Sequence, residues 1–177
     1  MRVRNSIIAR SGRQSAPPTR EWLRPRKRVQ SARGECIFEF IDHTADVAVR
    51  LRSTDEAELF RDAARALLAI ILDPASEPVG ASDAVPLTLE SEDGEALLVD
   101  FLNEIIFLFD TRRFLAGEVD VKSIALGRPA RIEAVLRGET YDPARHAAKT
   151  EVKAATFHGM TIARTPAGFE ADVVFDL

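Results

Sequence analysis

The segment from residue 94 to residue 113 constrains the fold more than any other part of the sequence. Its apolar residues recur at helical spacing and cover most of the circumference of a helix. They are Leu97, Leu98, Phe101, Leu102, Ile105, Ile106, Leu108 and Phe109. Asp100, Asn103 and Glu104 interrupt this apolar run, which is also too short to span a membrane. The sequence therefore predicts a helix that is buried inside a domain.

The rest of the chain predicts a second helix and about seven strands. Ser53, with Glu56 three residues later, is typical of a capping box, and apolar residues then repeat at helical spacing as far as Asp73. Alternation of apolar and polar residues indicates strands near residues 38–40, 47–51, 85–89, 118–126, 130–139, 151–162 and 169–175. We expect an α+β domain of mostly antiparallel sheets with two helices, one of them buried.

Residues 1–34 differ in composition from the rest of the chain. They contain ten Lys and Arg residues and a single acid, Glu21, with too little apolar content to build a core. We expect them to be a disordered basic tail or an over-extended start, with Val29 as an alternative start position. An organelle transit peptide and a basic arm that touches RNA are the other interpretations. Residues 35–177 are expected to form one folded domain.

The charge of residues 35–177 limits the partners of this domain. It contains 14 Lys and Arg residues against 27 Asp and Glu residues, a net charge of −13. Such a surface repels phosphate backbones, so we expect contact with RNA only through a partner protein. The single cysteine, Cys36, excludes an internal disulfide and a thiolate zinc cluster, and it suits the reducing cytoplasm. Neither a secretory signal nor a membrane anchor is expected.

Acidic groups at the two ends of the domain are the first candidate for chemistry. Asp46 precedes an expected strand, and Asp176 ends another, where it adjoins the terminal carboxylate of Leu177. If these groups meet, three carboxylates converge, and their oxygen atoms favour Ca²⁺, Mg²⁺ or Mn²⁺ over Zn²⁺. Spacing alone does not bring them together, and it favours a turn cap at Asp46 and a solvent-facing Asp176.

The stretch from residue 151 to residue 158 is the second candidate. In a regular strand, Glu151 and Lys153 share one face and His158 lies on the other. Lys153 can bind a phosphate or a partner's carboxylate, but the residues alone favour an ordinary cross-strand ion pair with Glu151 or with an acid opposite. His158, like His43, is more often a hydrogen-bonded structural residue than a ligand or a base. No motif for nucleophilic catalysis and no phosphate-binding loop is visible.

Several motifs follow one another in the order found in the archease family, which the sequence resembles over residues 37–177. The shared motifs are Phe40-Ile41-Asp42-His43-Thr44-Ala45-Asp46-Val47, Leu97-Leu98-Val99-Asp100-Phe101-Leu102-Asn103-Glu104-Ile105-Ile106, Gly117-Glu118, Glu151-Val152-Lys153-Ala154-Ala155-Thr156-Phe157-His158 and Phe175-Asp176-Leu177. The stretch 1–34 departs from the family pattern, and so does the final leucine, where isoleucine is common.

The resemblance implies an accessory protein of the RtcB-type RNA ligase, which joins RNA ends with GTP. Such a protein is not itself catalytic; it promotes guanylylation and multiple turnover of the ligase in tRNA splicing or RNA repair. The resemblance also implies a metal site at Asp46, Asp176 and the carboxylate of Leu177, with Ca²⁺ expected first. Lys153 is implied in activation, with Glu151 and His158 as weaker candidates.

Two other classes of function remain open at this point. The first is a metal-dependent phosphate-ester hydrolase, in which Asp46 and Asp176 hold the metal and His158 is the general base. The second is a chaperone-like binding module, whose effect on a partner does not depend on metal. Activity without a ligase would favour the hydrolase, and stimulation that survives metal removal would favour the binding module.

Overall fold

The computed structural model describes residues 25–30, 36–42 and 46–177, which form eight strands and two helices. The elements are β1 (Pro25–Gln30), β2 (Cys36–Asp42), β3 (Asp46–Ser53), α1 (Glu56–Ile71), β4 (Asp83–Ser91), α2 (Gly94–Arg112), β5 (Phe114–Ala125), β6 (Ala130–Thr140), β7 (Ala154–Thr165) and β8 (Gly168–Asp176). All strand pairs within the two sheets are antiparallel. The predicted α+β class is therefore confirmed.

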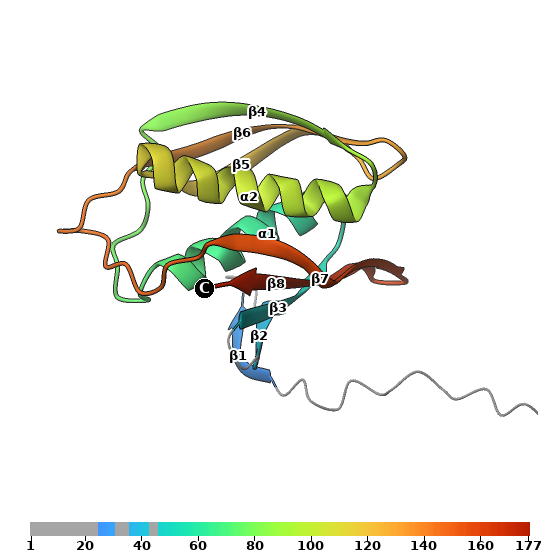
Figure 1. Cartoon of the computed structure of the whole chain (residues 1–177), viewed down its shortest axis with the longest axis horizontal. Coiled ribbons are helices and arrows are strands. Elements are labelled where there is room, and N and C mark those ends of the chain that lie inside the picture. The colour runs from blue at the N-terminus through green and yellow to red at the C-terminus, as the bar shows by residue number, and fades with distance from the viewer. Residues whose placement is uncertain (1–24, 31–35, 43–45) are drawn as a thin grey trace, which may run out of the picture.

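Two sheets enclose the helices. The larger sheet has the strand order β1-β2-β3-β8-β7, and the smaller one has the order β4-β6-β5. Figure 1 shows α1 and α2 in a layer between them, and each helix contacts strands of both sheets. β8 is an inner strand of the larger sheet, whereas β7 is its edge strand beside α2.

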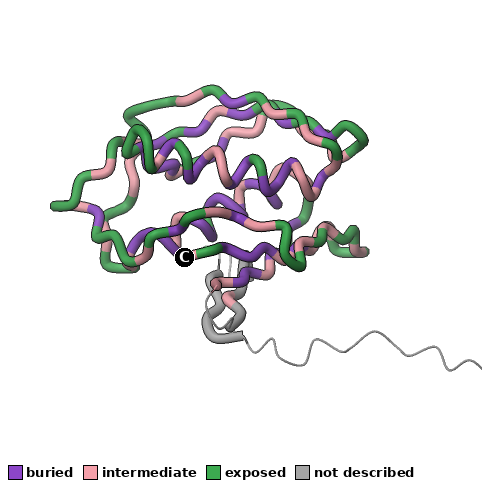
Figure 2. The backbone as a smooth tube through the Cα atoms, viewed as in Figure 1, coloured by how far each residue is buried: buried purple, intermediate pink, exposed green. Residues whose placement is uncertain are grey.

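The central position of α2 explains its apolar sequence. A helix between two sheets buries two faces, so apolar side chains must cover most of its circumference. All of the predicted residues except Phe109 are buried, and Phe109 is half-buried. Buried positions recur along the whole length of the helix (Figure 2). Asp93 caps the first turn by accepting a hydrogen bond from the Ala96 N–H at 3.0 Å. The helix ends at Arg112, and the residue that caps it, Arg113, adopts a left-handed conformation with φ 55°.

The start of α1 differs from the predicted capping box. The N-cap is Asp55, whose side chain accepts a hydrogen bond from the Glu58 N–H at 2.8 Å. Ser53 is instead the last residue of β3, and its buried hydroxyl donates to Asp62 at 2.7 Å. The prediction of the helix was right and the prediction of its cap was wrong, because an aspartate two residues later caps as well as a serine.

The boundary between tail and domain also differs from the prediction. β1, Pro25–Gln30, lies inside the stretch 1–34 that was expected to be disordered, and it pairs with β2. Such pairing uses main-chain hydrogen bonds and needs little apolar content, so composition does not reveal it. The remainder of that stretch lies outside the described residues. In the described part of the chain, neither helix is long and apolar enough to cross a membrane.

Strand β7 begins later than predicted and is not regular. It starts at Ala154, so residues 151–153 precede it as loop. Its register against β8 runs from Ala154 to Thr156 and resumes at Thr161. The predicted alternation of faces across residues 151–158 is therefore wrong, since a loop and a bulge interrupt the period of two.

Candidate functional site

The pairing of β3 with β8 brings together acids that are far apart in the sequence. Asp46 is the first residue of β3 and Asp176 the last of β8, and the two are direct partners in the antiparallel register. Side chains of directly opposed residues have Cβ atoms about 5 Å apart. The two carboxylates that the sequence alone left unconnected are thus neighbours at one end of the larger sheet (Figure 1).

Other charged pairs on the same face of this strand pair are complementary. Arg50 donates two hydrogen bonds to Asp172, at 2.7 and 3.0 Å, and Arg52 donates one to Glu170 at 3.1 Å. Each of these residues lies an even number of positions from Asp46 or Asp176 on its own strand, so all of the charged side chains are on one face of the sheet. Like charges directly opposite each other destabilise a sheet. The aspartate pair differs in that two carboxylates lie opposite each other, and their oxygen atoms are the ligands that a hard cation prefers.

Lys153 joins the aspartates from the other side of β8. Its backbone N–H donates to the carbonyl oxygen of Asp176 at 2.9 Å, and its ammonium donates to the main-chain oxygen of Leu177 at 2.6 Å. Lys153 is exposed, as is Asp176. The expected ordinary partner of this lysine, Glu151 or an acid on the opposite strand, is replaced by the end of the chain.

The donor groups at this end of the sheet fit a hard cation. Asp46, Asp176 and the terminal carboxylate of Leu177 offer only oxygen atoms, the ligands that Ca²⁺, Mg²⁺ and Mn²⁺ prefer. Within the described residues, no group of three or more His, Cys, Asp or Glu side chains could hold a metal. The candidate site differs from such a group, because Asp46 and Asp176 are its two acidic side chains and its third carboxylate is the main-chain terminus at Leu177.

The remaining predicted residues lie apart from the two aspartates. Glu151 is exposed in the loop before β7, two residues from Lys153. His158 is exposed in the irregular part of β7, about three strand positions or ~10 Å along the sheet from Asp176. His43 lies outside the described residues. The structure thus gathers Asp46, Asp176 and Lys153, but not His158.

A contact that the sequence did not reveal fixes β7 beside α2. The side-chain amide of Asn103 donates to the carbonyl oxygen of Ala155 at 3.2 Å and accepts from its N–H at 2.8 Å. The amide therefore satisfies both main-chain groups of this edge residue, as a neighbouring strand would. From the sequence, Asn103 was only one of the polar residues that interrupt an apolar helix, and nothing in the spacing indicates its partner.

The loop that leads from β6 to β7 is held by two ion pairs of Arg145. Arg145 contacts Glu139 at 2.7 Å and Glu77 at 2.9 Å. The hydrogen bond from Arg145, together with one from the Gly80 N–H, lowers the pKa of Glu139 to about 2. These contacts position the loop whose last residue is Lys153.

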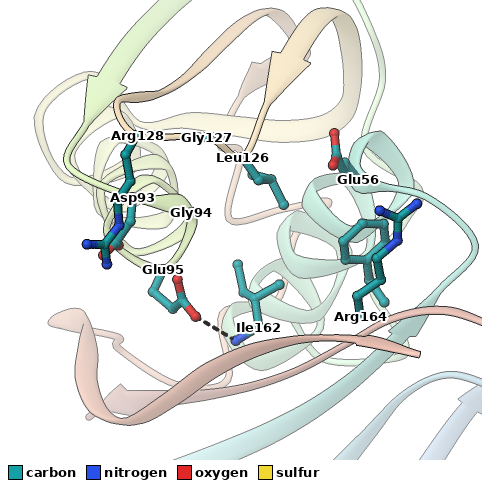
Figure 3. A pocket seen from close by; sticks show the side chains of 10 residues that line it. Glu56, Asp93, Gly94, Glu95, Leu126, Gly127, Arg128, Ile162 and Arg164 are labelled. Carbon is teal, nitrogen blue, oxygen red and sulfur yellow. Dashed lines mark hydrogen bonds and ion pairs between the residues drawn. The ribbon is translucent and has the colours of Figure 1, made fainter.

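A cavity of about 330 Å³ lies at the opposite end of β7 (Figure 3). It opens between the N-terminal ends of both helices, the β5–β6 turn and the β7–β8 hairpin. Two of its polar residues already have structural partners: Asp93 caps α2 and pairs with Arg128 at 3.1 Å, and Glu95 accepts from the Ile162 N–H at 3.2 Å. No pattern in the sequence indicates this cavity, and its lining residues indicate no particular ligand.

Comparison with known proteins agrees with this architecture. The family model described as "Archease protein family (MTH1598/TM1083)" matches residues 38–177. Protein archease of Methanopyrus kandleri is 38% identical over 141 residues, which cover 79% of this chain and 99% of that protein. Protein archease of Archaeoglobus fulgidus is 35% identical over 140 residues, with 79% and 98% covered.

Solved structures show the same fold. The solution structure of protein 1598 of Methanobacterium thermoautotrophicum has a TM-score of 0.68 and 32% identity, and the match covers 80% of this chain and 99% of that one. An archease from Thermotoga maritima has a TM-score of 0.51 at 22% identity, with 77% and 94% covered, and supports the fold alone. The family match spans the domain from β2 to its last residue, and the chain belongs to the archease family.

Proposed function

We propose that this protein is a metal-binding accessory protein that activates an RtcB-type RNA ligase. The observation that carries the proposal is the direct pairing of Asp46 with Asp176 on a sheet face whose other charged pairs are complementary. A cation held by these two residues and by the carboxylate of Leu177 would remove the repulsion between them. The protein itself is not catalytic in this proposal.

The cation is expected to be Ca²⁺, with Mg²⁺ and Mn²⁺ as alternatives, because all three donors are carboxylates. When bound, it supplies a positive charge that attracts phosphate oxygen atoms. Lys153 supplies a second positive charge, which its bond to the end of the chain holds beside the aspartates. Its ammonium is suited to pair with a phosphate or a carboxylate at the ligase active site.

The charge of the domain supports a protein partner. With a net charge of −13 over residues 35–177, the domain is repelled by RNA and attracted to a basic enzyme that binds RNA. RNA is therefore reached through the ligase. Promotion of guanylylation and of multiple turnover, in tRNA splicing or RNA repair, is the activity proposed for the complex.

The test is multiple-turnover ligation of RNA by a purified RtcB-type ligase with GTP, with and without the full-length protein. We expect stimulation by the wild type, its loss in chelator, and its loss in Asp176→Asn. Asp110→Asn is the matched control, because it removes one exposed acid that belongs to α2 and not to β3 or β8. Calorimetric titration with Ca²⁺ should show binding by the wild type and the control, but not by Asp176→Asn.

Two outcomes would contradict the proposal. Stimulation that persists in chelator and in Asp176→Asn would make the effect independent of the cation, as for a simple binding module. Hydrolysis of phosphate esters by the protein alone, abolished by Asp176→Asn but not by Asp110→Asn, would make it an enzyme.

A further inference from the structure

The irregular part of β7 is a wide bulge at the edge of the larger sheet. Thr156 pairs with Val174 and Thr161 with Asp172, so four residues, 157–160, lie opposite the single residue Val173. Gly159 within it has a φ of +69°, a conformation that favours glycine. Bulges of this kind are built features that aim side chains away from a sheet.

Side chains of α2 hold β7 on both sides of this bulge. Before the bulge, Asn103 binds both main-chain groups of Ala155. After the bulge, Glu95 accepts a hydrogen bond from the Ile162 N–H (Figure 3). These contacts occupy main-chain groups of the edge strand at two points and leave residues 157–160 projecting between them. The bulge is therefore fixed at both ends before any partner arrives.

The bulge presents an aromatic side chain to solvent. Phe157 is 60% exposed, and the one other large apolar side chain exposed among the described residues is Phe107 of α2, at 52%. Phe107 lies on a regular helix, where a single exposed apolar residue needs no explanation. Phe157, by contrast, lies on a bulge whose residues do not pair with β8. Hydrogen bonds from α2 hold β7 before and after this bulge. A rigid, exposed aromatic side chain is the usual anchor of a protein interface.

We propose that the bulge 157–160 is a docking loop, and that Phe157 inserts into an apolar recess in a basic surface of the partner enzyme. This proposal rests on the proposed function, because it names how that ligase is held. The bulge begins about three strand positions, or ~10 Å, from Asp176, so a partner seated on it has the acidic site within reach.

Charge selects the occupant of this surface. The exposed acid Asp176 lies about three strand positions from the bulge, and residues 35–177 carry a net charge of −13. A second copy of the domain is therefore repelled, whereas a basic RNA-binding surface is attracted. The basic stretch 1–34 of the same chain has a suitable charge as well, and the experiment must distinguish it from the ligase.

The experiment compares Phe157→Ser with Phe107→Ser in the full-length chain. Both changes replace an exposed phenylalanine, and urea unfolding verifies that both variants remain folded. Loss of an anchor should raise the concentration for half-maximal stimulation of the ligase at least tenfold in Phe157→Ser. Its maximal turnover should stay within twofold of the wild type, because the acidic site is intact. Phe107→Ser should match the wild type in both quantities.

Photo-crosslinking identifies the occupant. The full-length chain with benzoylphenylalanine at position 157 should crosslink to the ligase, and crosslinks to residues 1–34 or to a second copy instead would overturn the proposal. Equal half-maximal concentrations for Phe157→Ser and the wild type would also overturn it, while leaving the proposed function in place. Absence of stimulation by the wild type would overturn both.

Discussion

The hydrogen bonds between Asn103 and Ala155 predict a large effect from one isosteric substitution. Asn103→Leu keeps the shape of the side chain and removes its donor and its acceptor. The N–H and C=O of Ala155, a residue only 3% exposed, would then face an apolar group. Each backbone group left unsatisfied in this way costs about 1–3 kcal/mol. The two groups together cost about 2–6 kcal/mol, and the apolar surface of the buried leucine offsets part of this. We therefore expect Asn103→Leu to lower the free energy of unfolding by about 2–4 kcal/mol.

Urea denaturation followed by circular dichroism measures this loss. With slopes of about 2 kcal/mol per molar urea, the midpoint should fall by about 1–2 M. Asn103→Ala should lose less, about 1–2 kcal/mol, because the space it opens admits water and alanine favours the helix. Glu104→Ala, one position further along α2, is the control and should change stability by less than about 0.5 kcal/mol. A stability of Asn103→Leu within 0.5 kcal/mol of the wild type would refute this reasoning.

Three further predictions concern the acidic site and the loop before it. Lys153→Met should leave the Ca²⁺ affinity measured by calorimetry unchanged or tighter, because it removes a positive charge that competes for the end of the chain. The maximal stimulation of the ligase should fall. Weaker Ca²⁺ binding by this variant would contradict the prediction. A Gly-Ser extension after Leu177 turns the terminal carboxylate into an amide and should weaken Ca²⁺ binding at least tenfold, whereas an extension at the other end should not. Glu139 has its pKa lowered to about 2 from 4.5, so the stability it contributes is present above pH 4.5 and is lost as the pH falls towards 2. Acid unfolding of Glu139→Gln should therefore show a smaller loss of stability over that range than the wild type.

Local patterns predicted the helices well. The apolar residues of α2 recur within single turns of helix, so the period is visible without knowledge of the partner elements. The burial of this helix also followed, because apolar side chains around most of a helix leave no face for water. The position of the α1 cap did not follow, since Ser53 and Asp55 are both good caps and only the tertiary contact of Ser53 with Asp62 decides between them.

The candidate site was only half predictable. The spacing favoured a solvent-facing Asp176, and this residue is exposed in the structure. The neighbour of Asp176 depends on which strands pair and in what register, and the local sequence of β3 and β8 does not specify either. One feature of the sequence indicates the bulge in β7, a glycine within a predicted strand. This feature predicts neither the size of the bulge nor the residues of α2 that hold β7 on both sides of it.

The place of β8 in the larger sheet has a consequence for how the domain forms. β8 is the last strand of the sequence, yet it lies between β3 and β7 and joins positions as distant as Asp46 and Asp176. Until it arrives, the apolar residues Val49 and Leu51 of β3 are paired with β2 but lack their second neighbouring strand. Pairing across so long a stretch of chain slows folding and prolongs the exposure of partly folded states. Removing residues 168–177 would therefore prevent the larger sheet from forming. Its effect would not be limited to the loss of the carboxylates of Asp176 and Leu177 from an intact domain.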